Sequence, residues 1–254
     1  MEFKKMLPLK GMNAIITGSA KRIGKHLSLR LAQEGINLAL HYNSSDKDAK
    51  QLQKALENYP IKTTLIKQDL NITNAGEILF ESAINKLGKI DIVINNASIF
   101  PEHDIKTFSY EDLITSINIH AWAPLQLSRC LYSQCEQGII INILDTRLWD
   151  YDLRHSSYYL GKQLLRYITR TLAIEFAPKI RVNAIAPGLI LPPPGETHEY
   201  LKKMSKTNPL QTFGNENDVS DAVVFLLKAK FITGQVIFID GGRFLLGSVN
   251  DGII

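Results

Sequence analysis

Tyr158 and Lys162 stand at positions i and i+4, the spacing that brings two side chains onto one face of a helix. A tyrosine with an ordinary pKa of about 10 is a weak acid–base catalyst at neutral pH. A nearby ammonium favours the phenolate and lowers this pKa toward the working range. The pair therefore predicts an acid–base centre, although an isolated pair of this kind is more often a half-buried aromatic beside a solvated lysine.

Asp145 adds a carboxyl group, because it directly follows the apolar run at 138–144 and precedes Tyr158. A carboxylate would repel the alkoxide that develops during ketone reduction, so Asp145 argues against an ordinary ketone reductase. A carboxyl group instead suits the binding or protonation of a nitrogen heterocycle. The structural alternative is an aspartate that caps the turn after a strand. Trp149 and Tyr151 lie between Asp145 and Tyr158, and we expect them to line the same pocket.

A glycine-bearing turn follows the first apolar run of the chain, at 13–17. Gly18 and Gly24 would allow a tight turn and close packing of the segments around it. The N-terminus of the helix that follows can hold a pyrophosphate. The sequence therefore predicts a nucleotide site here, although two glycines in such a position are equally consistent with a purely structural turn.

The residues after the second apolar run, at 37–41, bear on the kind of nucleotide. They include no Asp or Glu before position 46, whereas an acidic residue there would bind an unphosphorylated ribose. Asn43, Ser44 and Ser45 offer hydrogen-bond donors, and Arg22 supplies positive charge. The pattern favours the 2′-phosphate of NADP, while a polar turn that caps the next helix is the structural alternative.

These side chains must be positioned by apolar runs that alternate with amphipathic stretches. Strands buried on both faces and separated by helices predict a parallel sheet with helices on both faces. Pro124 should mark a bend or a boundary within the longest helical stretch. The predicted strands are 13–17, 37–41, 63–67, 91–95, 138–144, 180–186 and 235–239, and the predicted helices are 23–33, 46–58, 74–86, 111–134, 157–176 and 217–227.

We therefore predict an α/β fold, a single doubly wound Rossmann-type domain with a seven-stranded, mainly parallel sheet and helices on both faces. No internal repeat or linker divides the chain. A nucleotide-binding half at about 9–135 and a catalytic and substrate half at about 136–254 are expected to form one domain over 1–254. Such sheets bind ligands at the carboxyl ends of their strands, where the residues above stand.

The composition excludes several other classes of protein. The 254 residues, 45% hydrophobic and 21% charged, are typical of an ordinary globular chain. Two cysteines cannot form a disulfide framework, which favours a cytoplasmic location. A dispersed net charge of +4 predicts no nucleic-acid partner, and the six histidines show no metal-ligand spacing. The chain has no apolar run long enough for a membrane span, and its first ten residues are unlike a signal peptide.

Seven motifs, taken in order, resemble those of the short-chain dehydrogenase/reductase family over about 9–243. Each motif alone is weak, but their order and their places on predicted strands and helices are typical of that family. The resemblance implies a nicotinamide-dependent oxidoreductase in which Asn118 would hold a water that links Lys162 to solvent. The motifs are Thr17-Gly18 with Gly24, Asp69, Asn95-Asn96-Ala97, Asn118, Tyr158 with Lys162, Pro187-Gly188 and Asp240-Gly241-Gly242.

Four residues resemble the pteridine reductase and dihydromonapterin reductase branch of that family. Arg22 stands where a third glycine is usual, and Asp145 where most members have a serine. Ser98 and Phe100 follow Asn-Asn-Ala as in the pteridine reductases. In that branch the arginine lies between cofactor phosphates and pterin, and the phenylalanine stacks on the pterin. The resemblance implies NADPH-dependent reduction of a dihydropterin, of the dihydrobiopterin, dihydromonapterin or dihydrofolate type, to its tetrahydro form.

The resemblance also implies a set of site residues and partners. The partners are a pterin or folate substrate and the copies of a homotetramer, with no membrane, nucleic acid or metal. The alternatives are a carbonyl or 3-oxoacyl reductase of other specificity, and a non-catalytic NADP-sensing protein. The implied residues are Asp145, Tyr158, Lys162 and Asn118 for catalysis; Gly18, Arg22, Ile23, Gly24, Tyr42, Asn43, Ser44, Ser45, Asp69, Leu70, Asn96, Ala97, Ser98, Tyr158, Lys162, Pro187 and Gly188 for NADPH; and Arg22, Ser98, Phe100, Asp145 and Tyr158 for the substrate.

Overall fold

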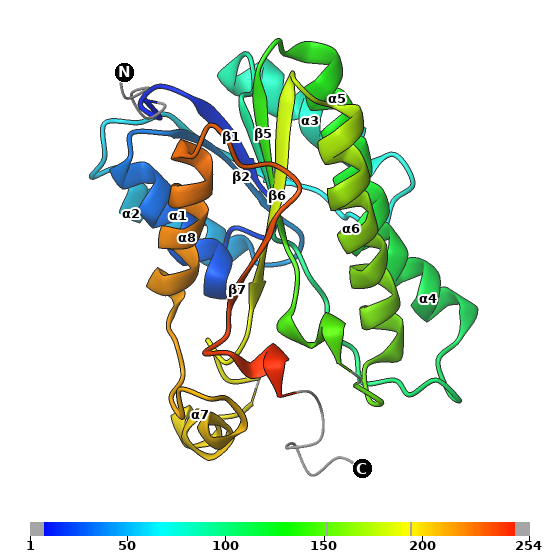
Figure 1. Ribbon diagram of the computed structural model, residues 1–254. Helices are drawn as coiled ribbons and strands as arrows, with labels where there is room; N and C mark the ends of the chain where they lie inside the picture. Colours follow the sequence, from blue (N-terminus) through cyan, green and yellow to red (C-terminus); the bar gives the residue numbers. More distant parts are fainter. Residues whose placement is uncertain (1–7, 151, 194, 247–254) are drawn as a thin grey trace.

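Seven parallel strands form one sheet in the order β3-β2-β1-β4-β5-β6-β7 (Figure 1). The computed structural model describes residues 8–150, 152–193 and 195–246. The direction of winding changes between β1 and β4, which is where ligands bind in doubly wound sheets. The strands are β1 (Asn13–Ile16), β2 (Asn37–Tyr42), β3 (Thr63–Lys67), β4 (Ile92–Asn95), β5 (Gly138–Ile143), β6 (Ile180–Pro187) and β7 (Val236–Ile239).

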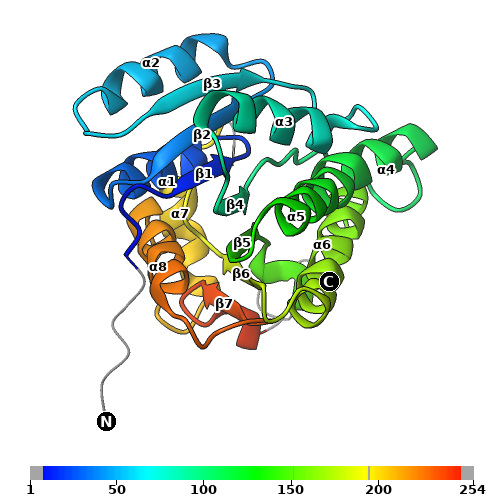
Figure 2. The ribbon, with the colours of Figure 1, turned by 90° about the horizontal axis from the view of Figure 1, so that it is seen from above.

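Helices cover both faces of this sheet, with α1 and α8 on one face and α3, α5 and α6 on the other (Figure 2). Short 3₁₀ turns occur at Thr146–Trp149, Ser205–Thr207 and Arg243–Leu245, and a π-helical segment at Asn118–Trp122. The α-helices are α1 (Arg22–Gln33), α2 (Asp46–Leu56), α3 (Ala75–Leu87), α4 (Tyr110–Ile117), α5 (Ala123–Gln134), α6 (Ser156–Glu175), α7 (His198–Met204) and α8 (Glu216–Lys228).

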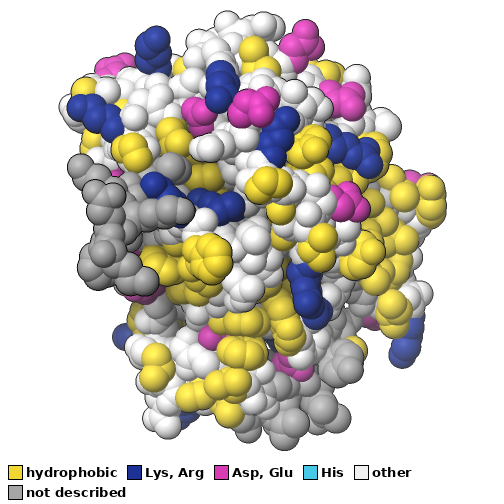
Figure 3. Space-filling view, turned by 45° about the horizontal axis from the view of Figure 1, so that its top comes forward, with side chains coloured by type: hydrophobic (Ala, Val, Ile, Leu, Met, Phe, Trp, Pro, Cys, Tyr) yellow, Lys and Arg dark blue, Asp and Glu magenta, His cyan; other side chains and the backbone are white. Residues whose placement is uncertain are grey.

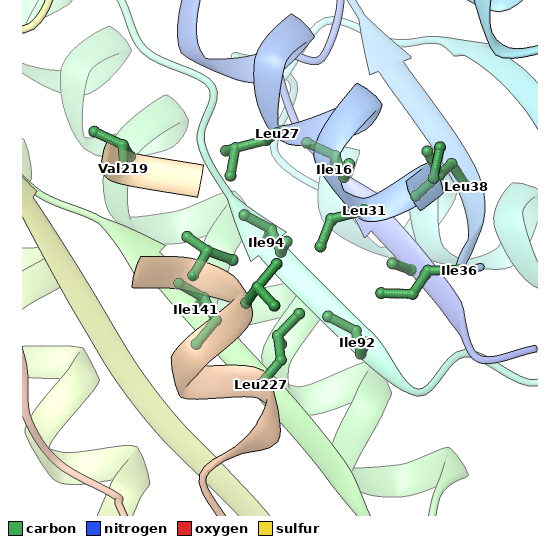
Figure 4. Close-up of a cluster of buried hydrophobic side chains, with 14 of the residues drawn as sticks. Ile16, Leu27, Leu31, Ile36, Leu38, Ile92, Ile94, Ile141, Val219 and Leu227 are labelled. Atoms are coloured by element: carbon green, nitrogen blue, oxygen red, sulfur yellow. The ribbon is translucent and has the colours of Figure 1, made fainter. Parts of the chain in front are cut away.

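The core consists of two apolar layers, one on each face of the sheet. Consecutive residues of a strand point to opposite faces, so Ile15 and Ile16 enter different layers. Ile16 packs in one layer with Leu27 of α1 and Leu227 of α8 (Figure 4). Burial of each such side chain contributes roughly 1.5–3 kcal/mol, so the sheet is a firm base for the loops at its ends.

The register of the strands brings their carboxyl ends level at the centre of the sheet. Ile16 of β1 pairs with Ile94 of β4, and Asn95 pairs with Asn142 of β5. The Asn95 side chain also donates to the Asn142 side chain at 2.7 Å, although both are buried. The loops after β1, β4 and β5 therefore start side by side.

The predicted fold class is confirmed, and each predicted strand agrees with the observed one to within one residue at either end. The sheet is entirely parallel over the described strands rather than mainly so. The boundary predicted within the helical stretch 111–134 is confirmed, because α5 begins at Ala123; the π-helical segment between α4 and α5 was not predicted. Pro124 lies in the first turn of α5, immediately after the π-helical segment. Helix α7 was not predicted.

The surface gives two further facts about the class of protein. Among the helices of the described ranges, none is both long and apolar enough to cross a membrane. On the face in Figure 3, Lys and Arg side chains are interspersed with Asp and Glu rather than gathered in one basic patch.

Candidate active site

A cavity of about 510 Å³ lies at the carboxyl ends of β1, β4, β5 and β6. Its volume is in the range of small-molecule sites, and its place is where a doubly wound sheet binds ligands. Predicted residues that line it are Gly18, Arg22, Ile23, Gly24, Asn96, Ala97, Ser98, Phe100, Asp145, Tyr158, Lys162, Pro187 and Gly188, joined by Lys21, Ile99, Ile143, Leu144, Ile190, Leu191 and Pro193.

The turn after β1 is held against the turn after β4. Thr17 Oγ1 accepts the backbone N–H groups of Asn96 and Ala97, each at 2.9 Å. The Asn96 side chain donates in return to the Thr17 and Gly18 carbonyls at 2.9 and 3.0 Å. Gly18 has φ +62°, and a Cβ there would lie 2.8 Å from Ala97 Cα. Only glycine therefore fits this turn.

Arg22 begins helix α1 in the left-handed region, with φ 51°. A side chain in this conformation carries strain, and the usual glycine of this position would not. Its guanidinium donates to the Pro192 carbonyl at 2.9 Å, which ties the turn to the loop after β6. No side-chain cap occupies the start of α1, so its first-turn amides can meet an anion. Arg22 thus adopts a strained backbone conformation beside a site suited to phosphate.

Asp145 caps a turn and also faces the cavity. Its Oδ1 accepts the backbone N–H of Arg147 at 2.8 Å and caps the 3₁₀ turn Thr146–Trp149. Its Oδ2 accepts the Tyr158 hydroxyl at 3.0 Å, and the Tyr159 hydroxyl lies 3.5 Å from Oδ1. Asp145 therefore caps this turn with one carboxylate oxygen and meets Tyr158 at the cavity with the other.

Burial is the largest cause of the pKa shifts of Asp145, Tyr158 and Lys162. Burial raises the pKa of Asp145, and burial followed by the Asp145 charge raises the pKa of Tyr158 well above its ordinary value. Burial lowers the pKa of Lys162 from 10.5 to about 8. Lys162 Nζ donates to the Ile143 carbonyl at 2.6 Å and lies 5.8 Å from the centre of the Tyr158 ring.

The expectation that Lys162 lowers the pKa of Tyr158 is therefore wrong for the protein's own groups. Burial of the phenol and then the adjacent Asp145 carboxylate raise the pKa of Tyr158, although the Lys162 ammonium lies nearby. Tyr158 is held as a neutral phenol whose proton points to Asp145. A neutral phenol beside a carboxyl group can hold and deliver a proton, which suits an acid rather than a base.

Phe100 forms part of the cavity wall and is backed by a histidine. Its ring stacks on His155 with centroids 3.7 Å apart and meets Tyr158 edge-on at 4.8 Å. His155 Nδ1 lies 2.9 Å from Asp152 Oδ1, so this histidine is itself held. Phe100 remains 46% exposed, which leaves ring surface for a planar ligand.

A buried histidine from the π-helical segment supports the other side of the Phe100 loop. His120 Nε2 accepts the Ile99 N–H at 3.2 Å and lies 3.1 Å from the Ser98 hydroxyl. Burial, and then the Lys162 charge, lower the pKa of His120 well below its ordinary value. Neither His120 nor His155 was predicted; the only signal was that each stands close in sequence to a predicted site residue.

The residues predicted for the adenosine end lie outside the wall of the cavity: Tyr42 is the last residue of β2, and the others follow β2 or β3. Asn43 and Ser44 are exposed, and Ser45 begins α2 without a side-chain cap bond. Tyr42 and Leu70 are buried. Asp69 is exposed and accepts the Asn71 N–H at 2.9 Å. Asn43, Ser44 and Asp69 are therefore the exposed polar groups of this predicted set.

Some predicted residues stand away from the cavity. Asn118 lies in the π-helical segment and its side chain donates to Asn71, at 3.0 Å to both the carbonyl and the side-chain oxygen. Trp149 packs edge-on against Phe238 and is not part of the cavity wall. Tyr151 lies outside the described residues. The structure therefore joins Asp145, Tyr158 and Lys162, and does not bring Asn118 to them by a direct hydrogen bond among the described contacts.

Comparison with known proteins adds a family and several relatives. The family model described as enoyl-(acyl carrier protein) reductase matches residues 18–243. An oxidoreductase of Bacillus subtilis, YhdF, is 30% identical over 93% of this chain and 85% of its own length. The 3-oxoacyl-[acyl-carrier-protein] reductase FabG of Staphylococcus aureus is 28% identical over 92% of this chain and 98% of its own length.

The solved structures include a close match in fold. FolM alternative dihydrofolate reductase 1 of Brucella canis, crystallised with NADP, superposes with a TM-score of 0.88. It is 29% identical in sequence, and the match covers 98% of this chain and all of that one.

Proposed function

Because the chain belongs to the short-chain dehydrogenase/reductase family, and is thus an oxidoreductase, we propose that it reduces a dihydropterin to its tetrahydro form with NADPH. The substrate is of the dihydrobiopterin, dihydromonapterin or dihydrofolate type. The observation that carries the proposal is a half-buried Asp145 hydrogen-bonded to Tyr158 at the cavity. The likeness to FolM of Brucella canis, a dihydrofolate reductase by name, supports it.

The residues around Gly18 fit NADPH. The cramped turn excludes a Cβ, and the first-turn amides of α1 have no side-chain cap, so both suit a pyrophosphate. Arg22 would add charge to the phosphates, and Asn43 to Ser45 would bind the 2′-phosphate. Lys162 would hold the ribose, with Pro187 and Gly188 beside the nicotinamide. NADPH, when bound, supplies a hydride to a C=N carbon of the pterin.

The proton side of the reaction belongs to Tyr158 and Asp145. Burial raises both pKa values, so Tyr158 stays a neutral donor, and the Asp145 carboxylate beside it takes up a proton more readily than an exposed aspartate does. A carboxyl group with two oxygens can accept from or donate to adjacent nitrogens of a heterocycle. The buried Lys162 ammonium partly opposes the rise in the Asp145 pKa and so favours the carboxylate form beside the phenol.

Phe100 and Arg22 would hold the ring of the substrate. Phe100 offers a face already fixed by His155 behind it, so little side-chain freedom is lost when a planar ring stacks there. Arg22 reaches across to Pro192 and closes one side of the cavity wall. Both would keep water from the reacting atoms.

Reduction of a 3-oxoacyl thioester is the second candidate, because FabG of Staphylococcus aureus is among the relatives. A ketone becomes an alkoxide during reduction, and the Asp145 charge 3.0 Å from the Tyr158 hydroxyl would disfavour it. A non-catalytic NADP sensor remains the third candidate and would bind NADPH without turnover.

NADPH oxidation by the purified protein separates the three candidates. Dihydrobiopterin, dihydromonapterin and dihydrofolate are compared with 3-oxoacyl thioesters and simple ketones at equal concentration. We expect turnover with at least one dihydropterin and little with the carbonyl compounds. Turnover with carbonyl compounds alone would refute the proposal, and NADPH binding without any turnover would favour the sensor.

A further inference from the structure

His41 lies near the end of β2, beneath the turn that follows β1, and is only 2% exposed. Its Nδ1 lies 3.0 Å from the backbone nitrogen of Gly18, which donates to it. Its Nε2 lies 2.9 Å from the carbonyl oxygen of Gln68, at the end of β3. One side chain of β2 thus connects the loops that follow its two neighbours, β1 and β3.

These two partners permit only one form of the imidazole. The Gly18 N–H requires a lone pair on Nδ1, and the Gln68 carbonyl requires a proton on Nε2. The other neutral tautomer would satisfy neither contact, and the imidazolium would lose the Gly18 bond. The hydrogen-bond network therefore assigns the neutral Nε2–H tautomer.

The backbone of His41 holds the same turn. Its carbonyl oxygen accepts the Ser19 N–H at 2.9 Å and the Ser19 hydroxyl at 3.0 Å. Asn96 holds the opposite side of the turn through the Thr17 and Gly18 carbonyls. Since the Gly18 N–H is used by His41, a phosphate must be met by the later amides at the start of α1.

The charge state of His41 agrees with this geometry. Burial lowers its pKa from 6.5 to about 4, and the hydrogen bond to Gln68 and the charge of Asp69 only partly oppose this. The imidazole is therefore neutral at any ordinary working pH, as the contact with Gly18 requires.

We infer that His41 is a positioning residue for cofactor binding: its neutral Nε2–H tautomer fixes the direction of the Gly18 peptide and so the phosphate-binding turn. It touches neither the cavity nor the reacting atoms among the described contacts and acts through Gly18. This inference rests on the proposed NADPH site. It does not depend on which substrate is reduced.

Two matched variants separate the roles of the two ring nitrogens. His41→Asn puts an amide oxygen where Nδ1 stands and keeps an acceptor for Gly18, but gives up the bond to Gln68. His41→Gln reaches the position of Nε2 and keeps the donor to Gln68, but leaves the Gly18 N–H unsatisfied. Each variant loses one buried hydrogen bond, so a purely structural role predicts equal losses of thermal stability and of affinity.

The readout is the dissociation constant for NADPH, measured by fluorescence titration beside thermal unfolding. We expect His41→Gln to bind NADPH at least about 10-fold more weakly, as one unsatisfied buried donor implies, and His41→Asn to stay within about 3-fold. Equal weakening in both variants, or wild-type affinity in both, would overturn the inference.

A measurement on the unaltered protein covers the case in which the variants do not fold. Nitrogen NMR of labelled histidine should give His41 an acceptor-type Nδ1 and a protonated Nε2 at neutral pH. An Nδ1–H tautomer or an imidazolium would overturn the inference. Absence of NADPH binding by the wild type would refute the proposed cofactor, whereas the NMR result would still test the tautomer on its own.

Discussion

Replacing Asp145 with asparagine removes one charge from the cavity while keeping the size of the side chain. The amide oxygen should face the Arg147 N–H, which Oδ1 accepts at 2.8 Å. The amide N–H₂ would then face the Tyr158 hydroxyl, which now donates to Oδ2 at 3.0 Å. Tyr158 would change from donor to acceptor at this contact. The variant therefore tests the carboxyl group without opening a cavity.

The expected loss follows from two contributions. A hydrogen bond to a charged group contributes about 1.5–3 kcal/mol, which is about 10- to 150-fold in kcat/KM for the dihydropterin. Loss of a positioned proton donor or acceptor costs about 100-fold or more. Both contributions come from the same carboxyl group and are not additive, so we expect kcat/KM for the dihydropterin to fall by at least about 100-fold. NADPH affinity should stay within about 3-fold, because Asp145 is not among the residues proposed to bind the cofactor.

The assay is steady-state NADPH oxidation with the best dihydropterin, beside NADPH titration and thermal unfolding of the same preparations. Asp145→Ser serves as a matched variant, because it supplies the hydroxyl that most members of the family carry. It should also lose pterin reduction and should gain activity on carbonyl compounds. Pterin reduction by Asp145→Asn at the wild-type rate would refute the role of this carboxyl group.

Variants at three further positions test other parts of the site. Phe100→Ala should raise KM for the dihydropterin about 10-fold and leave KM for NADPH unchanged. Phe100→Tyr keeps an aromatic ring and should keep the wild-type KM for the dihydropterin. A wild-type KM for the dihydropterin in Phe100→Ala would exclude ring stacking. Arg22→Gly relieves the strain at φ 51° but adds backbone freedom, so the free energy of unfolding should change by less than about 1 kcal/mol while NADPH affinity falls about 10-fold. Loss of stability without loss of affinity would contradict this. Lys162 releases its proton at a pKa of about 8 when folded and near 10.5 when unfolded, so the unfolded chain binds more protons between these values and stability rises with pH. The rise should be about 1.5 kcal/mol between pH 8 and about pH 9.5 in urea titrations, and Lys162→Met should abolish that share of the slope; an unchanged slope would contradict the lowered pKa.

The fold could be predicted because its signals are local. The central strands are buried on both faces and are therefore continuous apolar runs, as at Ile139 to Ile141 of β5. Gly18, Asp145 and Pro187 could be assigned to one edge of the sheet, since each follows a predicted strand and all strands are parallel. The π-helical segment at Asn118–Trp122 escaped prediction because its residues do not differ in pattern from those of an ordinary helix.

Contacts between distant parts of the chain could not be predicted. Arg22 meets the Pro192 carbonyl, 170 residues away in sequence, through an irregular loop. The support of Phe100 by His155 likewise depends on how two loops meet. The direction of the Tyr158 pKa shift was mispredicted because spacing indicates which charges are near but not how much water is excluded.

The position of β1 between β2 and β4 bears on how the chain folds during synthesis. Thr17 Oγ1 finds its partner at Ala97 only 80 residues later, and the Asn13 N–H finds the Asp91 carboxylate 78 residues later. The turn at Gly18 therefore lacks its contacts with the loop after β4 until β4 has left the ribosome. Contacts between residues so far apart in sequence form slowly. The dinucleotide site is incomplete before that point. NADPH should consequently stabilise the whole chain as one cooperative unit. The unfolding temperature should rise with NADPH concentration, while thermal unfolding remains a single transition.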